Sequence, residues 1–95
     1  MPIVWTQTAV RHLAAIQAYI ERDKPLAAKR VANKILEAIA LLAAHPYLGR
    51  PGRKPGTREL IIPDTPYLVP YRVQDDRLTI LAVFHGARRR RKLEE

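Results

Sequence analysis

The residues with the clearest chemical potential lie near the end of the chain. His85 follows the apolar stretch LTILAVF, and after one glycine and one alanine comes a run of five cations, residues 88–92. An imidazole exchanges protons close to neutral pH, and fixed cations stabilise negative charge that develops on a phosphoryl group. His85 beside this run is therefore compatible with two roles: the acid/base group of a nuclease, or a histidine at a strand end beside a charged segment that binds a partner.

Metal-free cleavage of RNA needs several groups besides one imidazole. It needs a base for the 2′-hydroxyl proton, an acid for the 5′-oxygen leaving group, and cations that stabilise the phosphorane. The candidates besides His85 are Arg58 and Arg72 as cations, and Glu59 or Tyr71 as the second acid/base. Because any basic sheet commonly carries an arginine, a tyrosine and an acid, this set is compatible with catalysis without being specific for it.

The other two histidines fit structural positions. His12 lies one position off the apolar face of an expected helix, and His45 precedes Pro46 at an expected helix end, where a cation is favourable. No two histidines have the spacing of metal ligands on a helix, and the chain has no cysteine. We therefore expect no metal site, no cofactor and no disulfide.

The chain is strongly basic, with 17 lysines and arginines against 9 aspartates and glutamates and a net charge of +8. Such a charge attracts polyanions, either nucleic acid or an acidic protein. The sequence shows neither a signal-peptide pattern nor an apolar stretch long enough to cross a membrane. We expect one domain over residues 1–95, with a basic tail at residues 88–95, in the cytoplasm.

Two helices are predicted in the first half of the chain. Over residues 7–21, apolar side chains recur at helical spacing, and Thr6 or Thr8 can cap the start. A second helix begins at Pro25, which suits a first helical turn, and its apolar residues keep this spacing to about residue 43. Because only a few residues join them, the two helices should form an antiparallel hairpin.

Strands are expected on both sides of this hairpin. The runs that predict strands are residues 2–5, 57–62, 67–73 and 77–85. Pro70 cannot donate to a ladder, so its strand should be unpaired or bulged there. Three prolines and three glycines in residues 45–56 predict a loop without regular structure. The order β-α-α-β-β-β gives the α+β class, with the helical hairpin packed on one face of a small antiparallel sheet.

The whole pattern resembles the RelE/ParE superfamily of toxins from type II toxin–antitoxin modules, and within it the ParE-like, plasmid-stabilisation branch. The resemblance is carried by TQTAVRHLAAIQAYI, PLAAKRVANKILEAIALLAAHPYLGRPG, GTRELII, PYLVPYRV and LTILAVFHGARR, which are collinear and cover about residues 3–90. It implies a small growth-inhibiting toxin with a RelE/ParE-like fold. It also implies an antitoxin whose acidic C-terminal segment lies partly, as a helix, against the helical hairpin and runs partly along the sheet. The residues expected to form the antitoxin groove are Leu13, Ile16, Ile20, Ile35 and Ile39.

The superfamily is divided by target. The resemblance implies DNA gyrase for ParE-like members and messenger RNA on the ribosome for RelE-like members. This chain offers only Arg58 in the strand before Pro63, carries Leu68 where a ribosome-dependent relative can have an arginine, and ends in the ParE-like VFHGAR. We therefore expect gyrase inhibition by binding, without catalytic residues. The residues expected to contact a partner are Arg50, Arg53, Arg58, Arg72, Arg88, Arg89 and Arg90.

Two alternatives stay open. The first is a metal-independent, ribosome-dependent mRNA endoribonuclease of the RelE type, using Arg58, Glu59, Tyr71, Arg72 and His85. The second is a plain nucleic-acid-binding domain, whose binding would depend steeply on salt and need no antitoxin.

Overall fold

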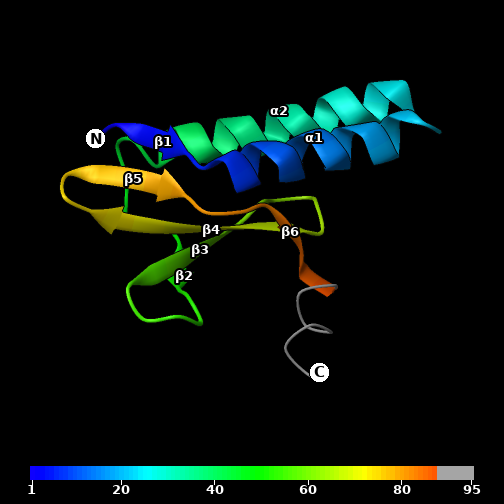
Figure 1. Cartoon of the computed structure of the whole chain (residues 1–95). Coiled ribbons are helices and arrows are strands. Elements are labelled where there is room, and N and C mark those ends of the chain that lie inside the picture. Colours follow the sequence, from blue (N-terminus) through cyan, green and yellow to red (C-terminus); the bar gives the residue numbers. More distant parts are fainter. Residues whose placement is uncertain (88–95) are drawn as a thin grey trace.

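The structure is a computed structural model that describes residues 1–87 of the 95. Two helices lie side by side across one face of a sheet (Figure 1). The elements are β1 (Ile3–Trp5), α1 (Gln7–Glu21), α2 (Pro25–Leu41), β2 (Arg50–Pro51), β3 (Thr57–Ile61), β4 (Tyr67–Gln74), β5 (Arg77–Ile80) and β6 (Phe84–His85). The predicted α+β class and the helical hairpin on a sheet are confirmed.

The sheet has the strand order β1-β5-β4-β3-β2, and β6 pairs with β4. It is mixed rather than purely antiparallel, because β1 runs parallel to β5. The short strand β2 pairs with Arg58 and Glu59, inside a stretch where the sequence predicts no regular structure. That prediction is wrong for two residues, because a strand edge supplied by the fold can pair with a segment that has no strand pattern of its own.

Thr6 fixes the start of α1 and joins it to the sheet. Its hydroxyl oxygen accepts a hydrogen bond from the N–H of Ala9 at 3.1 Å, which confirms the predicted N-cap. The same hydroxyl donates to the carbonyl of Ile80 at 2.9 Å, and the Thr6 N–H donates to that carbonyl at 3.1 Å. Helix α1 therefore leaves the sheet where β1 stops pairing with β5.

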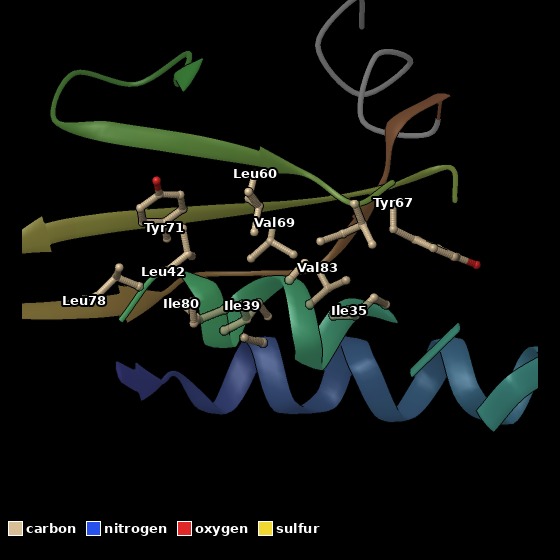
Figure 2. Close-up of a cluster of buried hydrophobic side chains, with 13 residues drawn as sticks. Ile35, Ile39, Leu42, Leu60, Tyr67, Val69, Tyr71, Leu78, Ile80 and Val83 are labelled. Atoms are coloured by element: carbon tan, nitrogen blue, oxygen red, sulfur yellow. The ribbon is translucent and has the colours of Figure 1, made fainter. Parts of the chain in front are cut away.

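The core lies between the sheet and the hairpin, and α2 supplies more of it than α1. Ile35 and Ile39 of α2, and Leu42 just after it, are buried against the sheet (Figure 2). Within α1, Ala9 is the one fully buried residue, whereas Leu13, Ile16 and Ile20 are half-buried and Val10 and Tyr19 are exposed. Since burying a large aliphatic side chain contributes about 1.5–3 kcal/mol, α2 is the main attachment of the hairpin to the sheet.

A β-bulge interrupts the last predicted strand opposite Pro70. Two residues of β4, Val69 and Pro70, face three residues of the next strand, 81–83. The proline has no N–H to donate, and its carbonyl accepts from the Leu81 N–H at 3.0 Å. The predicted irregularity at Pro70 is confirmed, and the extra residue divides the predicted strand into β5 and β6.

Candidate functional site

An open groove of about 930 Å³ lies between α1 and the end of the sheet formed by β6. Its lining includes the ring side chains of His12, Tyr19, Tyr67, Phe84 and His85, together with Ile16 and Lys54. The groove, which we call the α1–β6 groove, thus combines apolar and aromatic surface with two imidazoles and one ammonium group.

His12 connects α1 to the bulge. Its Nδ1 accepts a hydrogen bond from the N–H of Val83 at 3.2 Å, and its ring lies against Phe84 with 5.3 Å between the ring centroids. The accepting nitrogen must be unprotonated, so the proton of a neutral His12 is on Nε2. The sequence predicts a surface or boundary residue, and the half-buried ring agrees with that. The role as acceptor had no signal in the sequence, because it depends on the bulge.

His85 lies at the other wall of the groove. It is paired with Tyr67 across β4 and β6, and the two rings meet edge to face at 5.7 Å. Its Nδ1 is buried and has no hydrogen-bond partner among residues 1–87. The imidazole is thus anchored by its ring and keeps one nitrogen for a further hydrogen bond.

A second cluster surrounds Tyr71, which is fully buried. Its hydroxyl oxygen accepts from the N–H of Gly49 at 2.9 Å and donates to the carbonyl of Pro46 at 2.8 Å. Burial raises the pKa of Tyr71 above its usual 10.0, and the hydrogen bond from Gly49 and the positive charge of Arg58 offset this only in part. The phenol is therefore a neutral structural group that binds the segment between α2 and β2.

Arg58 lies directly opposite Tyr71 on β3 and holds the same segment. Its Nη1 donates to the carbonyl of Gly49 at 2.7 Å and to that of Tyr47 at 3.3 Å, and its guanidinium lies 5.0 Å from the centre of the Tyr47 ring. The pair Arg58 and Tyr71, which we call the clamp, therefore binds four backbone groups of residues 46–49.

Glu59 is also buried, although the sequence predicts a candidate acid/base there. Its Oε1 accepts from Arg50 Nη2 at 3.2 Å, and the side chain of Arg50 is 61% exposed. Adjacent residues of a strand point to opposite faces, so Glu59 and Arg72 lie on the face away from the helices, whereas Arg58 and Tyr71 lie on the helix face. Arg72 is half-buried.

The five residues of the expected ribonuclease set are thus divided among different places. His85 is paired with Tyr67, four residues along β4 from Tyr71, which is about 13 Å at the rise of a strand. Figure 2 shows Tyr67 and Tyr71 at opposite ends of the buried cluster. Within residues 1–87, His85 is therefore separated from the clamp.

The cations expected at a partner surface have different surroundings. Arg50 and Arg53 are exposed on and after β2, and Arg58 and Arg72 are half-buried. Arg88, Arg89 and Arg90 lie outside the described residues. Within residues 1–87, Arg53 is therefore the expected partner-binding cation that is most available to a partner.

The expected antitoxin groove is placed differently from its prediction. Ile35 and Ile39 are 0% and 3% exposed in the core, so their assignment to a partner groove is wrong. The physical reason is that α2 covers the sheet and its whole apolar stripe is used there. Leu13, Ile16 and Ile20 of α1 are half-buried, and Ile16 lines the α1–β6 groove.

Nothing in the described part of the chain resembles a metal centre: residues 1–87 hold no group of three or more His, Cys, Asp or Glu that could bind an ion. The described helices include none that is long and apolar enough to cross a membrane.

Comparisons with known proteins agree with this fold. The model of the family "ParE toxin of type II toxin-antitoxin system, parDE" matches residues 3–90. A relative from Sinorhizobium fredii named toxin Y4kP is 51% identical over 84 residues, which cover 88% of this chain and 86% of the relative. Toxin RelE2 of Caulobacter vibrioides is 36% identical over 86 residues, which cover 90% and 96% of the two chains.

Two solved structures are similar in fold. A chain of the chromosomal ParDE toxin–antitoxin system from P. aeruginosa has a TM-score of 0.82 and 30% identity, covering 90% of this chain and 95% of that chain. A chain of the RelBE2 toxin–antitoxin complex from Mycobacterium tuberculosis has a TM-score of 0.64 and 27% identity, covering 88% and 95%.

Proposed function

Because this chain belongs to the family of ParE toxins of type II toxin–antitoxin systems, we propose that it inhibits DNA gyrase by binding and is neutralised by an acidic segment of a cognate antitoxin. The observation that favours gyrase inhibition by binding over RNA cleavage is that the groups that RNA cleavage would need are buried. Tyr71 is fully buried, Glu59 is 3% exposed, and both are hydrogen-bonded within the fold. A buried phenol with both hydrogen-bonding functions occupied cannot exchange a proton with a bound RNA.

The cationic surface supports binding to a charged partner. Arg53 is exposed, and the chain carries a net charge of +8. Complementary charge accelerates association and fixes the orientation of a complex. The basic tail at residues 88–95 would add to this attraction, and it lies outside the described residues.

The α1–β6 groove supports neutralisation by an antitoxin. Ile16 and the 63% exposed Tyr19 present apolar surface on α1, with Tyr67 and Phe84 opposite them. An amphipathic helix binds such a groove by its apolar face, and acidic residues on the rest of the segment would complement the basic toxin. The solved relatives of similar fold come from toxin–antitoxin systems, which agrees with this role.

RNA cleavage is the second candidate, and one observation favours it. His85 is half-buried in the wall of a groove that also contains Lys54, and its Nδ1 has no hydrogen-bond partner within residues 1–87. An imidazole and an ammonium group could serve as acid/base and cation, although the clamp residues could not join them. Toxin RelE2 is the relative consistent with this candidate.

A supercoiling assay tests the proposed target. The purified protein is added to gyrase, ATP and relaxed plasmid, with and without the antitoxin, and in parallel to translating ribosomes with an mRNA whose cleavage is mapped. We expect lost supercoiling or trapped linear DNA that the antitoxin reverses, an intact mRNA, and full inhibition by His85→Ala. Normal supercoiling at large toxin excess would overturn the gyrase proposal, and mRNA cleavage abolished by His85→Ala would replace it.

A matched pair of variants tests the part played by surface charge. Arg53→Glu changes an exposed cation near the sheet edge, whereas Lys29→Glu makes the same change on the exposed side of α2. We expect Arg53→Glu to raise the toxin concentration needed for half inhibition several-fold more than Lys29→Glu. Equal effects would indicate that net charge, rather than this loop, is what the target recognises.

A further inference from the structure

The β-bulge opposite Pro70 leaves one backbone group outside the sheet ladder. Residues 81–83 face two residues of β4, and the N–H of Val83 donates to His12 Nδ1 at 3.2 Å instead of to a strand. Val83 is 3% exposed, and a buried N–H without an acceptor is costly. This hydrogen bond, which we call the bulge contact, therefore attaches the bulge to α1.

The bulge contact also fixes one wall of the α1–β6 groove. Phe84 and His85 follow Val83 directly and line the groove opposite α1. Strand β6 consists of these two residues, so few ladder bonds to β4 hold it. The ring of His12 adds a contact with Phe84, with 5.3 Å between the ring centroids. His12 is therefore a positioning residue for this wall of the groove.

The bulge contact exists only while the His12 ring is neutral. A neutral imidazole has one nitrogen that accepts a hydrogen bond, whereas a protonated ring carries an N–H at both nitrogens and accepts none. Histidine takes up this proton as the pH falls from about 8 to about 5. The half-buried ring lines an open groove, so protons from solvent can reach it. Acid would thus turn an N–H of His12 toward the N–H of Val83, and two donors cannot form a hydrogen bond.

The charged groups around His12 do not compensate a positive ring. The titratable side chains that line the groove with it are Tyr19 of α1, Lys54 of the loop before β3, Tyr67 of β4 and His85 of β6. Within residues 1–87, no aspartate or glutamate lines this groove. A protonated His12 would face an ammonium group and a second imidazole, without a carboxylate to pair with. We therefore expect protonation to separate the ring from the bulge rather than to form a new contact in the groove.

We propose that His12 is a pH-sensitive switch in the α1–β6 groove, whose neutral ring holds β6 against α1 and whose protonation releases it. Below neutral pH, the wall formed by Phe84 and His85 then moves relative to α1. The switch itself rests on the bulge contact and its surroundings. Its consequence for the antitoxin rests on the proposed function of this groove: a groove with a displaced wall binds the antitoxin less tightly.

NMR titration of the isotope-labelled full-length protein from about pH 8 to about pH 5.5 tests the switch. The Val83 amide and the His12 ring should titrate together, with one midpoint. His12→Asn is the matched variant, because the amide Oδ1 is bonded to Cγ as Nδ1 is in histidine and accepts a hydrogen bond without titrating. Near pH 5.5, after correction for intrinsic rates, we expect the Val83 amide to exchange about tenfold faster in wild type than in His12→Asn, and near pH 8 equally fast.

Two outcomes would overturn the switch. The first is a Val83 amide whose midpoint differs from that of the His12 ring or follows that of His85. The second is equal exchange of this amide in wild type and His12→Asn near pH 5.5, with thermal unfolding near pH 8 showing that the variant is folded. The titration of the wild-type protein decides the question even if the variant does not fold.

Calorimetric titration with the antitoxin tests the consequence separately. Between about pH 8 and about pH 6, wild type should lose about threefold more affinity than His12→Asn. Equal losses together with the expected Val83 titration would support the switch and overturn its effect on neutralisation. Absence of antitoxin binding at every pH would overturn the proposed neutralisation, and the NMR titration would still decide the switch.

Discussion

The hydroxyl of Tyr71 should be worth a measurable part of the folding free energy. In Tyr71→Phe the ring stays in the core, but Gly49 N–H loses its acceptor and Pro46 loses its donor. Gly49 is buried, and an unsatisfied buried group costs about 1–3 kcal/mol, whereas the half-buried Pro46 carbonyl can reach water. We expect Tyr71→Phe to lower the free energy of unfolding by about 2 kcal/mol. That is a large fraction of the roughly 5–15 kcal/mol typical of a small domain.

Equilibrium unfolding in urea measures this loss directly. The expected change is a lower midpoint with an unchanged slope, together with a decrease in Tm of about 10 °C for a domain of this size. Tyr47→Phe is the matched control, because the Tyr47 ring is 64% exposed and phenylalanine keeps the stacking under Arg58. It should change the free energy of unfolding by less than about 0.5 kcal/mol.

Equal stabilities of Tyr71→Phe and wild type would refute this reasoning. That result would mean that residues 46–49 are hydrated or held by other groups, and that the clamp does not fix Leu48.

Three further changes follow from the same contacts. Because the pKa of Tyr71 is raised above 10.0 in the folded state, the contribution of the neutral phenol to stability is intact below that pH and is lost as the pH rises. Tm measured from about pH 8 upward should therefore fall more steeply above pH 10 for wild type than for Tyr71→Phe. Parallel curves for the two proteins would contradict this. His12→Ala leaves the buried Val83 N–H without its acceptor, so the free energy of unfolding in urea should fall by about 1–2 kcal/mol. The control is His45→Ala, at an exposed position, which should lower it by less than about 0.5 kcal/mol. Similar losses in the two variants would exclude the role of His12 at the bulge. Gly49→Ala places a methyl group 2.7 Å from the Tyr71 ring and 2.8 Å from a backbone carbonyl, and should lower the free energy of unfolding by about 1–3 kcal/mol. The control is Gly86→Ala, where the nearest atom to the added methyl group is at 3.4 Å. A Gly49→Ala protein as stable as wild type would show that residues 46–49 do not pack directly on the Tyr71 ring.

Much of the fold could be predicted because its signals are local. The helical spacing of apolar residues, the cap at Thr6 and the missing N–H of Pro70 are properties of a few neighbouring residues. β2 and the parallel pairing of β1 could not be predicted in this way. Arg50 and Pro51 become a strand only because β3 offers an edge, and periodicity does not specify which strand β1 will join.

The candidate site was less accessible to sequence reasoning for a related reason. Spacing shows that Ile16 and Ile35 each lie on an apolar stripe, but it does not show that α2 covers the sheet while α1 lies over its edge. The chemistry of Arg58 and Tyr71 makes both of them candidates, and they are indeed neighbours in the sheet. Their hydrogen-bonding groups are occupied by residues 46–49, which is a property of the packed loop and is not encoded in the residue types.

The position of β5 between β1 and β4 determines when this protein can fold during its synthesis. Thr6 and Ile80, which are hydrogen-bonded, are 74 residues apart in sequence, so the first strand has no partner until the ribosome has made nearly the whole chain. Contacts between such distant residues require a large loop to close and slow folding. Until then the apolar stripe of α2 has no completed sheet to cover it. A nascent toxin of this topology therefore has a period before folding in which it has no assembled surface with which to act, and a co-expressed antitoxin can be present before the toxin is complete.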